Sequence, residues 1–473
     1  MRKWHKLISL LLFFALLIAA CAPKATEAPA VIATTAPPTE APAKPTTAPA
    51  TEAPTAAPVE KPVKITIWSH WVDEPVAQKY LQEVWADYET EHPNVDITVE
   101  FSQKADFLAA AINAFTVGEG GPDLFFVDRE IQSTFTIVDA GWAAPLDNVI
   151  DWTQMVPASK DAASWKNAKG ETHTWYGMIE AYADMILYNP KIFEELGIVL
   201  PENYQLTADE FYNMAVQCRK AGYDPIGAGS GDRKYPGQYI YKFALISKLG
   251  MEEFTKLWNG KISWDDPRVR ETLEWVQKLV EIPAFPATYS TMLLAESFQY
   301  FHTKQKACMF TVGTWYTGRT FKSPEEGGQP VDFRNGFMRY PAFPDGVGTN
   351  QGNMTAGAGF AVWQQGPNRE IAEDIVRFML QEKYGTKWIV DTGGLPGIKY
   401  NPDAISEDNP FKWYFDGFNK SYGTYDWAMN LSNPCPDLYS AYEAYINDGL
   451  APQLITIDEA IAGIEAARAK CGG

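Results

Sequence analysis

Strand and helix signals alternate along this chain from residue 63 onward, and that alternation limits the folds open to it. The first predicted elements are strands over residues 63–68, 95–101 and 123–127 and helices over residues 75–91 and 105–116. The strands are rich in β-branched side chains, the helices carry apolar residues near helical spacing, and proline and glycine lie between them. A βαβαβ order of this kind predicts parallel strands whose faces are covered by helices, so the fold class is α/β.

The alternation continues through the rest of the chain. A strand over 178–188 and helices over 207–221, 266–280 and 368–382 are expected. Residues 63–473 exceed the ~250–300 residues at which a single hydrophobic core stops growing, so two lobes are expected. The chain is 46% hydrophobic and 14% aromatic, which is enough to fill two such cores.

The N-terminus carries the pattern of an export signal. Basic residues precede an apolar run over residues 7–20, which is shorter than the ~20 residues that span a bilayer. The sequence Ile18-Ala19-Ala20-Cys21 resembles the processing site of bacterial lipoproteins. We therefore predict a signal peptide over 1–20 and lipidation of Cys21, which anchors the protein to the outer face of the cell membrane.

Residues 21–62 show no pattern that could bury an apolar face. After Cys21 they are almost wholly Ala, Pro, Thr and Glu, a composition typical of disordered segments. We predict a disordered stalk that lets the globular part move away from the membrane and return to it.

Charge and cysteine content restrict the function further. A net charge of -19 argues against binding to nucleic acid, and an uncharged or cationic ligand suits it better. Outside the cytoplasm, Cys218, Cys308, Cys435 and Cys471 are expected to form disulfides, and the sequence leaves their pairing open. The five histidines are scattered and there is no Cys-x-x-Cys motif, so we expect no metal site and no cofactor.

Several short motifs, in their order along the chain, resemble those of a known family. They are Ile65-Thr66-Ile67-Trp68, Gly121-Pro122-Asp123-Leu124, Leu187-Tyr188-Asn189-Pro190-Lys191, Gly313-Thr314-Trp315, Gly359-Phe360-Ala361-Val362 and Gly394-Leu395-Pro396-Gly397. The chain is thereby similar to the family 1, maltose-binding-like branch of the extracellular solute-binding proteins of ABC importers.

The resemblance implies a two-lobed, periplasmic-binding-protein-like (type II) fold with a hinge that the chain crosses more than once. Mapping the segments gives lobe 1 over residues 63–177 plus 357–402 and lobe 2 over residues 178–356 plus 403–473. The family binds its ligand in the cleft between the lobes. Implied partners are a small carbohydrate and the transmembrane permease subunits of an ABC importer, with the binding protein acting as a monomer.

Residues just after each predicted strand are the first candidates for the site, because open α/β sheets bind ligands beyond the carboxyl ends of their strands. His70 and Trp71, with Asp73 and Glu74, follow the first strand and offer the aromatic face and polar partners that a sugar needs. Alternatively, Trp68 belongs to the core, and Asp73 and Glu74 cap the next helix.

A second candidate pair, Asp128 and Arg129, follows the strand over 123–127. In the family such a pair contacts sugar hydroxyls, so the resemblance implies the same role here. An internal ion pair or a helix cap is the alternative.

The crossing between the lobes supplies Glu180, Tyr182 and Asp184. The family places an acidic or aromatic ligand contact a few residues before a Tyr-Asn pair, which is Tyr188-Asn189 here. The spacing differs in this chain, so the sequence leaves open which of the three side chains faces the cleft.

Three further candidates come from later in the chain. The resemblance implies that Trp315 stacks on a sugar ring, and Gly357 lies at the second hinge crossing, where a small residue permits bending and close approach. Trp427 belongs to an aromatic-rich C-terminal stretch that could line the cleft from lobe 2. For Trp427 the alternative is a place in the core.

Other classes of protein fit this sequence less well than a transport receptor. A secreted glycoside hydrolase would share the acidic, aromatic-rich α/β character, but it needs two opposed carboxylates and this strand order is not a repeated barrel. Ser230 lies outside a G-x-S-x-G elbow, so we expect no catalytic residue and no enzyme. A polysaccharide-binding protein without a transport role stays open, as does a phosphate-ester ligand held by Arg129, Lys234 and Arg319.

Overall fold

The computed structural model describes residues 62–128, 132–157, 159–232, 235–320, 322–355, 357–430 and 435–471. The predicted signal peptide, the predicted lipidation site Cys21 and the predicted stalk up to residue 61 lie outside the described residues, as does Arg129. Glu60–Gly473 clusters as one compact unit.

A first sheet contains the predicted N-terminal strands. Its strands are β1 (Val63–Ser69), β2 (Val95–Phe101), β3 (Leu124–Asp128), β6 (Gly177–Met178) and β12 (Ala358–Val362), in the order β2-β1-β3-β12-β6. β1 runs parallel to β2 and β3, whereas β12 runs antiparallel to β3 and β6. The predicted parallel arrangement is therefore right for the first strands and wrong for β12, because β12 enters the sheet on the return path from the second half of the chain.

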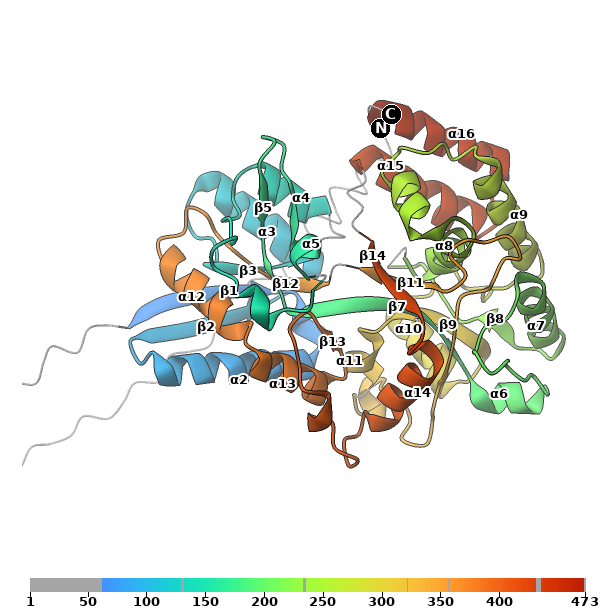
Figure 1. Ribbon diagram of the computed structural model, residues 1–473, viewed down its shortest axis with the longest axis horizontal. Coiled ribbons are helices and arrows are strands. Elements are labelled where there is room, and N and C mark those ends of the chain that lie inside the picture. The colour runs from blue at the N-terminus through green and yellow to red at the C-terminus, as the bar shows by residue number, and fades with distance from the viewer. Residues whose placement is uncertain are drawn as a thin grey trace, which may run out of the picture. The chain divides into compact units, whose positions relative to one another are not determined.

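Helices cover both faces of this sheet (Figure 1). They are α2 (Pro75–Glu91), α3 (Lys104–Val117), α4 (Gln132–Asp139), α5 (Ser159–Ala163), α12 (Arg369–Met379) and α13 (Glu382–Thr392). A short hairpin of β4 (Ser164–Lys166) and β5 (Thr172–Thr174) adjoins α5. Residues 65–182 and 358–398 contribute side chains to one buried core, and we call the part of the chain built on it lobe 1.

A second sheet has the order β14-β11-β7-β9-β8. Its strands are β7 (Glu180–Tyr188), β8 (Asp224–Ile226), β9 (Ala307–Gly313), β11 (Gln351–Thr355) and β14 (Asp426–Asn430), and β10 (Gly336–Met338) and β13 (Leu395–Pro396) also pair with β7. β7 is antiparallel to β9 and β11, while β8 is parallel to β9 and β14 to β11. This sheet is mixed, which also corrects the prediction of parallel sheets.

The second sheet carries its own layer of helices (Figure 1). They are α6 (Pro190–Glu195), α7 (Ala208–Lys220), α8 (Tyr235–Trp258), α9 (Pro267–Glu281), α10 (Leu294–Phe298), α11 (Tyr316–Thr320), α14 (Lys412–Tyr422), α15 (Pro436–Tyr442) and α16 (Ile457–Arg468). A second buried core takes its side chains from residues 185–343 and 414–464, and we call this part lobe 2. The predicted two-lobed α/β architecture is confirmed.

Segments that cross between the lobes lie against one another. β13 pairs with the start of β7, with Leu395 opposite Ala181. At Gly357 any side chain would collide with the backbone carbonyl of Glu180, so this position is confined to glycine by the contact between two crossing segments. The Tyr176 hydroxyl donates a 3.0 Å hydrogen bond to the Gly357 carbonyl and holds the two crossings together.

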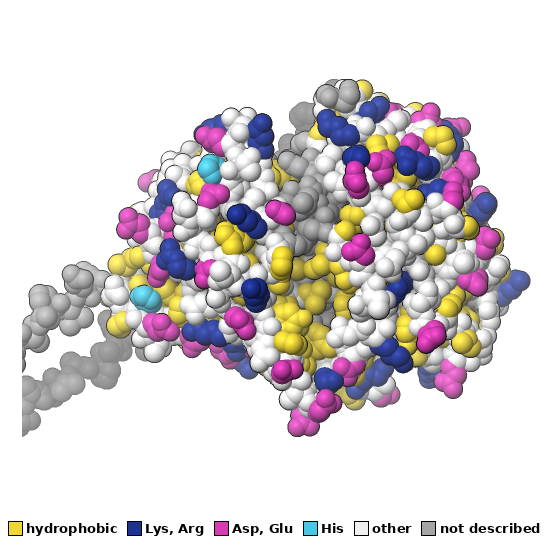
Figure 2. Space-filling model, in the orientation of Figure 1, with side chains coloured by type: hydrophobic (Ala, Val, Ile, Leu, Met, Phe, Trp, Pro, Cys, Tyr) yellow, Lys and Arg dark blue, Asp and Glu magenta, His cyan; other side chains and the backbone are white. Residues whose placement is uncertain are grey.

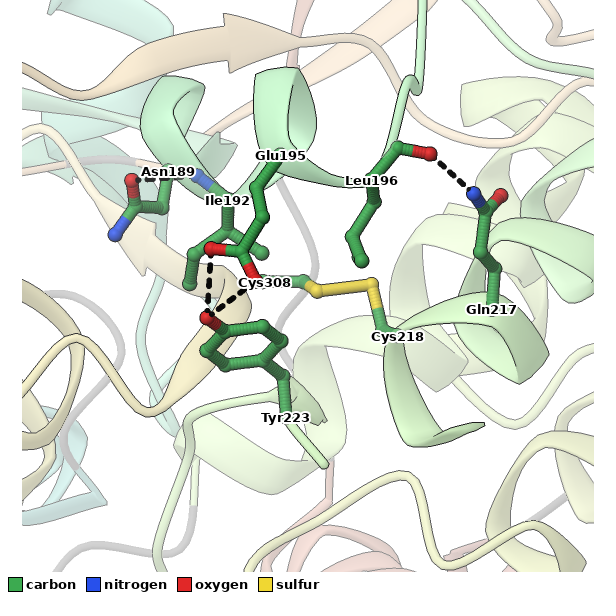
Figure 3. Close-up of a disulfide and its surroundings, with 8 residues drawn as sticks. All are labelled: Asn189, Ile192, Glu195, Leu196, Gln217, Cys218, Tyr223 and Cys308. Atoms are coloured by element: carbon green, nitrogen blue, oxygen red, sulfur yellow. Dashed lines mark hydrogen bonds between the residues drawn. A yellow bond between two sulfur atoms is a disulfide. The ribbon is translucent and has the colours of Figure 1, made fainter. Parts of the chain in front are cut away.

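Disulfides connect distant parts of lobe 2 and resolve the pairing that the sequence left open. Cys218 on α7 pairs with Cys308 on β9, 90 residues later, and Cys435 before α15 pairs with Cys471 near the C-terminus. Figure 3 shows the first of these beside Tyr223, whose hydroxyl donates a 3.0 Å hydrogen bond to the Glu195 carboxylate. Cys218 and Cys308 are fully buried, so this disulfide joins a helix to the sheet inside the core.

The predicted ends of α2, which begins at a proline, agree with the structure, whereas the predicted end of the helix over 368–382 is wrong. α2 begins at Pro75 and ends at Glu91, as predicted. The helix predicted over 368–382 ends earlier, at Met379, because Gln381 is extended and becomes the N-cap of α13.

Candidate functional site

A pocket lies where lobe 1 meets lobe 2. It encloses about 280 Å³ of empty space, part of it open to solvent. Its lining residues are Glu74, Ala77, Glu180, Trp315, Thr317, Gly318, Trp388, Thr392 and Gly394. They come from the start of α2 and the end of α13 in lobe 1, from the start of β7, and from the segment after β9 in lobe 2. Figure 2 shows hydrophobic side chains gathered along this boundary between the lobes.

Trp315 is the aromatic side chain of lobe 2 in this pocket. Its ring is partly buried and packs against the cores of both lobes, so it spans the boundary. A side chain at Gly313 would collide with the Trp315 indole nitrogen, so that glycine makes room for the ring. The loop is anchored to β7, because Thr314 N–H donates to the Ala183 carbonyl at 3.0 Å and Ala183 N–H donates to Thr314 Oγ1 at 3.1 Å.

Trp388 is the aromatic side chain of lobe 1 in this pocket, and the sequence analysis missed it. It is 2% exposed and stacks on Trp71 at 5.5 Å between ring centroids, with Tyr80 edge-on at 4.9 Å. The Tyr80 hydroxyl also donates to the Tyr384 carbonyl, which fixes α13 against α2. The available signal was a tryptophan close to the Gly393-Gly394 step that ends a helix.

The end of α13 builds the wall beside Trp388. Gly393 has φ 69°, the left-handed conformation that commonly ends a helix, and its N–H donates to Ile389 O at 3.1 Å. Thr392 Oγ1 donates to the Trp388 carbonyl at 2.7 Å and accepts the Gly394 N–H at 3.0 Å. These bonds fix the backbone of the wall, and glycine leaves its inner side open.

Glu180 and Tyr182 form the acidic part of the site. The Tyr182 side chain is 9% exposed, and its burial raises the pKa of its hydroxyl well above the ordinary value. The nearby carboxylates of Glu180, Asp128 and Glu74 raise that pKa further, and Glu180 shares a hydrogen bond with the Tyr182 hydroxyl. The structure thus brings three predicted site residues, Asp128, Glu180 and Tyr182, into one electrostatic group, and only Glu180 of these lines the pocket.

From the sequence, Glu74 is either a carboxylate partner for a sugar or a helix cap. It occupies the N-cap position of α2, but its side chain makes no capping hydrogen bond. Instead it lines the pocket, and a side chain at Gly318 of lobe 2 would lie 4.0 Å from Glu74 Oε2.

The predicted site residues after β1, which are His70, Trp71 and Asp73, do not lie together in the pocket. The His70 ring lies over Phe126, with 4.0 Å between centroids, and Trp71 is 2% exposed beneath Trp388. Trp71 therefore supports the pocket wall from the core and is not one of the lining residues. Asp73 ends a short 3-10 turn (Trp71–Asp73), and its side chain lies outside the described part of the structure.

Asp184 points into the interior of lobe 2. It is 1% exposed, pairs with Lys242 Nζ at 2.7 Å and accepts a hydrogen bond from Asn353 Nδ2 at 2.5 Å. Of the three candidates at the crossing, Glu180 is therefore the one that the structure places at the pocket.

The remaining candidates lie away from the pocket lining. Gly357 packs on the Glu180 backbone, and Trp427 stacks on Phe418 of α14 at 5.7 Å as part of the lobe 2 packing. In the described residues no group of three or more His, Cys, Asp or Glu is arranged to hold a metal ion. Nor does the described part contain a helix that is both apolar enough and long enough to cross a membrane.

Comparison with known proteins identifies the family. The sequence profile of the bacterial extracellular solute-binding proteins matches residues 73–386, and the chain belongs to that family. The resemblance seen in the sequence is confirmed. Membership implies a location outside the cytoplasm, and the fold is that of substrate-binding proteins.

Individual relatives are distant. An uncharacterized ABC transporter extracellular-binding protein from Pyrococcus horikoshii is 23% identical over 252 residues, or 53% of this chain. The match spans about half (55%) of that relative's length.

Solved structures share the fold. A protein from work on xylan utilization by the thermophilic bacterium Caldanaerobius polysaccharolyticus superposes with a TM-score of 0.72 at 19% identity, covering 85% of this chain and 99% of the other. A chitin oligosaccharide binding protein gives 0.69 at 16% identity, covering 86% and 98%.

Proposed function

We propose that this protein is the substrate-binding lipoprotein of an ABC importer and captures a sugar or oligosaccharide between its two lobes. The observation that carries the proposal is the pocket at the lobe boundary, where Trp315 of lobe 2 and Trp388 of lobe 1 lie with Glu74 and Glu180. Aromatic rings pack on the C–H faces of sugars, and carboxylates accept hydrogen bonds from sugar hydroxyls.

The proposed mechanism is lobe closure. A ligand in this pocket touches both lobes at once, so it gains contacts in the closed arrangement that an open arrangement cannot offer. Binding therefore shifts the population toward the closed form, which docks on the permease subunits. The protein performs no chemistry on its ligand and acts as a monomer.

Several assignments made from the sequence remain predictions. They are the ligand-binding roles of His70, Trp71, Asp73, Asp128, Arg129, Glu180, Tyr182, Asp184, Trp315, Gly357 and Trp427, the lobe limits at residues 177, 356 and 402, and the lipid anchor at Cys21. The pocket lining supports direct contact by Glu180 and Trp315, and the packing of Asp184, Gly357 and Trp427 away from it supports an indirect role for these three.

A thermal-shift screen followed by recovery of the ligand tests the proposal. The screen uses xylotriose, N,N′-diacetylchitobiose, maltose, galactose and glycerol 3-phosphate. A receptor should be stabilised by at least one of the sugars through mass action and should return it intact after prolonged incubation. Turnover that scales with protein concentration and survives repurification would favour a hydrolase. Stabilisation by none of the sugars would contradict a carbohydrate ligand.

A further inference from the structure

One corner of the pocket holds a buried donor that has no acceptor. Trp388 is 2% exposed and lines the pocket, and within the described residues its indole N–H has no hydrogen-bond partner. Several buried indole N–H groups of the described residues lack a partner, and that of Trp388 is the one that belongs to a pocket-lining residue, where a ligand can supply the acceptor.

Two further polar atoms converge on the same small space. A Cβ atom placed on Gly394 would lie 2.8 Å from Trp388 Nε1, 3.1 Å from Thr392 Oγ1 and 3.3 Å from Glu180 Oε1. Because position 394 is glycine, this space beside its Cα carries no side chain. A ligand group packed against the Gly394 backbone at this corner therefore lies near all three polar atoms.

The hydrogen-bonding character of these atoms selects one kind of ligand group. The indole Nε1 can only donate, and a carboxylate such as Glu180 can only accept. Thr392 Oγ1 already donates to the Trp388 carbonyl and accepts the Gly394 N–H, so toward the pocket it can only accept. A group that satisfies the corner must accept one hydrogen bond and donate at least one.

We propose that the corner formed by Trp388, Thr392 and Glu180 binds a hydroxyl group of an uncharged sugar. A hydroxyl both accepts and donates, as the corner requires. A phosphate or carboxylate oxygen carries no proton for Glu180 and would face the negative charge of Glu74 as well. An ammonium group cannot accept the Trp388 N–H. The inference rests on the proposed function. It favours neutral sugars over the phosphate esters that the sequence left open, because a phosphate elsewhere in the pocket would face the carboxylates of Glu74 and Glu180.

The test removes the donor while it keeps an aromatic ring. Trp388→Phe lacks the indole N–H, and its matched control is Trp363→Phe. Trp363 is 3% exposed in the same core, its indole N–H also has no partner among the described residues, and it is not one of the pocket-lining residues. Calorimetry with the tightest neutral sugar of the screen should show binding weakened about 3- to 10-fold in Trp388→Phe and unchanged in Trp363→Phe.

A set of ligand analogues shows whether the effect comes from one hydroxyl. Each monodeoxy analogue of that sugar is measured on wild type and on Trp388→Phe. The analogue that lacks the corner hydroxyl should bind wild type more weakly than the parent sugar, and this difference should shrink in Trp388→Phe because the pair is already broken. If every analogue loses the same factor in both proteins, Trp388 contacts no hydroxyl and the inference is overturned.

A second variant fills the corner from the other side. Gly394→Ala places a methyl group where the hydroxyl would enter, so it should weaken sugar binding at least as much as Trp388→Phe. Unchanged affinity in this variant would overturn the inference as well.

The failure of this inference can be told apart from failure of the proposed function. If no sugar of the screen binds wild type, the proposed function has failed. If a sugar binds but neither variant changes its affinity, only the hydroxyl corner has failed. If glycerol 3-phosphate binds more tightly than every sugar, solute binding stands and the neutral ligand class is overturned.

Discussion

At the scale of single residues, Trp315 offers the sharpest test of the pocket. Trp315→Ala removes a ring face worth on the order of 1–3 kcal/mol, so sugar affinity should fall roughly 5- to 150-fold. The unliganded melting temperature should change little, because the ring is only partly buried at the lobe boundary. Calorimetric affinity and thermal unfolding of the same variant check both points.

The matched control is Trp264→Ala. Trp264 is fully buried in the lobe 2 core, where loss of a tryptophan costs about 3–5 kcal/mol of stability. This control should lower the melting temperature strongly. If Trp315→Ala behaves in the same way and leaves affinity intact, Trp315 is a core residue and the pocket assignment fails.

His302 sets a pH dependence of stability. Its Nδ1 lies 3.0 Å from the Tyr316 hydroxyl and its Nε2 lies 3.3 Å from the Gly327 carbonyl, which fits a neutral ring with the proton on Nε2. Burial lowers the pKa of His302 from 6.5 to about 4. Between these values the unfolded chain binds a proton that the folded protein does not, so the free energy of unfolding should fall as pH drops from about 6.5 to about 4.

The size of that effect follows from the shift in pKa. A shift from 6.5 to about 4 corresponds to a loss of up to about 3 kcal/mol, with no contribution above pH 7. Urea unfolding at pH 7.0 and pH 4.5 should show a smaller difference in His302→Gln than in wild type. An equal difference in both proteins would mean that His302 does not titrate in this way.

At the scale of elements, the disulfides should differ in their contribution to stability. The Cys218–Cys308 pair closes 90 residues and the Cys435–Cys471 pair closes 36, for which chain entropy gives about 4.6 and about 3.8 kcal/mol. Replacing the first pair with Cys218→Ala and Cys308→Ala should therefore lower the free energy of unfolding more than replacing the second pair with Cys435→Ala and Cys471→Ala. The first pair is also fully buried, so its loss leaves poorer packing between α7 and β9. Denaturant unfolding of the two double variants ranks them, and the reverse order would contradict this account.

The elements also show which parts of the structure the sequence could predict. Proline and glycine mark local boundaries, which is why α2 was predicted to the residue. Strand direction was not predictable in the same way, because the direction of β12 depends on how the chain returns across the hinge. Local patterns report local geometry, and the return path is a property of the whole chain.

In the candidate site, too, local motifs predicted some residues, whereas others depend on tertiary packing. Trp315 and Glu180 could be named because each lies in or beside a motif that resembles the family, and both line the pocket. Trp388 could not be named, because its place depends on the docking of α13 against α2. Nor could the sequence show that Asp184 turns away to meet Lys242, since these residues lie far apart in the chain.

At the scale of the whole molecule, the two lobes have separate hydrophobic cores that are joined by only a few chain segments. The chain passes between them near residues 182–185, near 355–358 and a third time between residues 398 and 414, and β13 and Trp315 lie at the same boundary. A molecule with two independent cores can change the angle between its lobes without repacking either core. The pocket is lined by both lobes, so the same boundary that allows motion also binds the proposed ligand.

The predicted lipid anchor at Cys21 is expected to hold the globular part close to its membrane partner. Cys21 follows the apolar N-terminal run at a lipoprotein-like processing site, and the pocket residues all lie beyond residue 73. Lipidation needs the Cys21 thiol, so Cys21→Ser should release the exported protein from membranes into the soluble fraction. The released protein should have the same sugar affinity and melting temperature as the globular part made without residues 1–61, because anchoring and binding use separate parts of the chain. Membrane fractionation and calorimetry check the two halves of this prediction separately. A Cys21→Ser protein that stays in the membrane fraction would show that something other than this lipid anchors it.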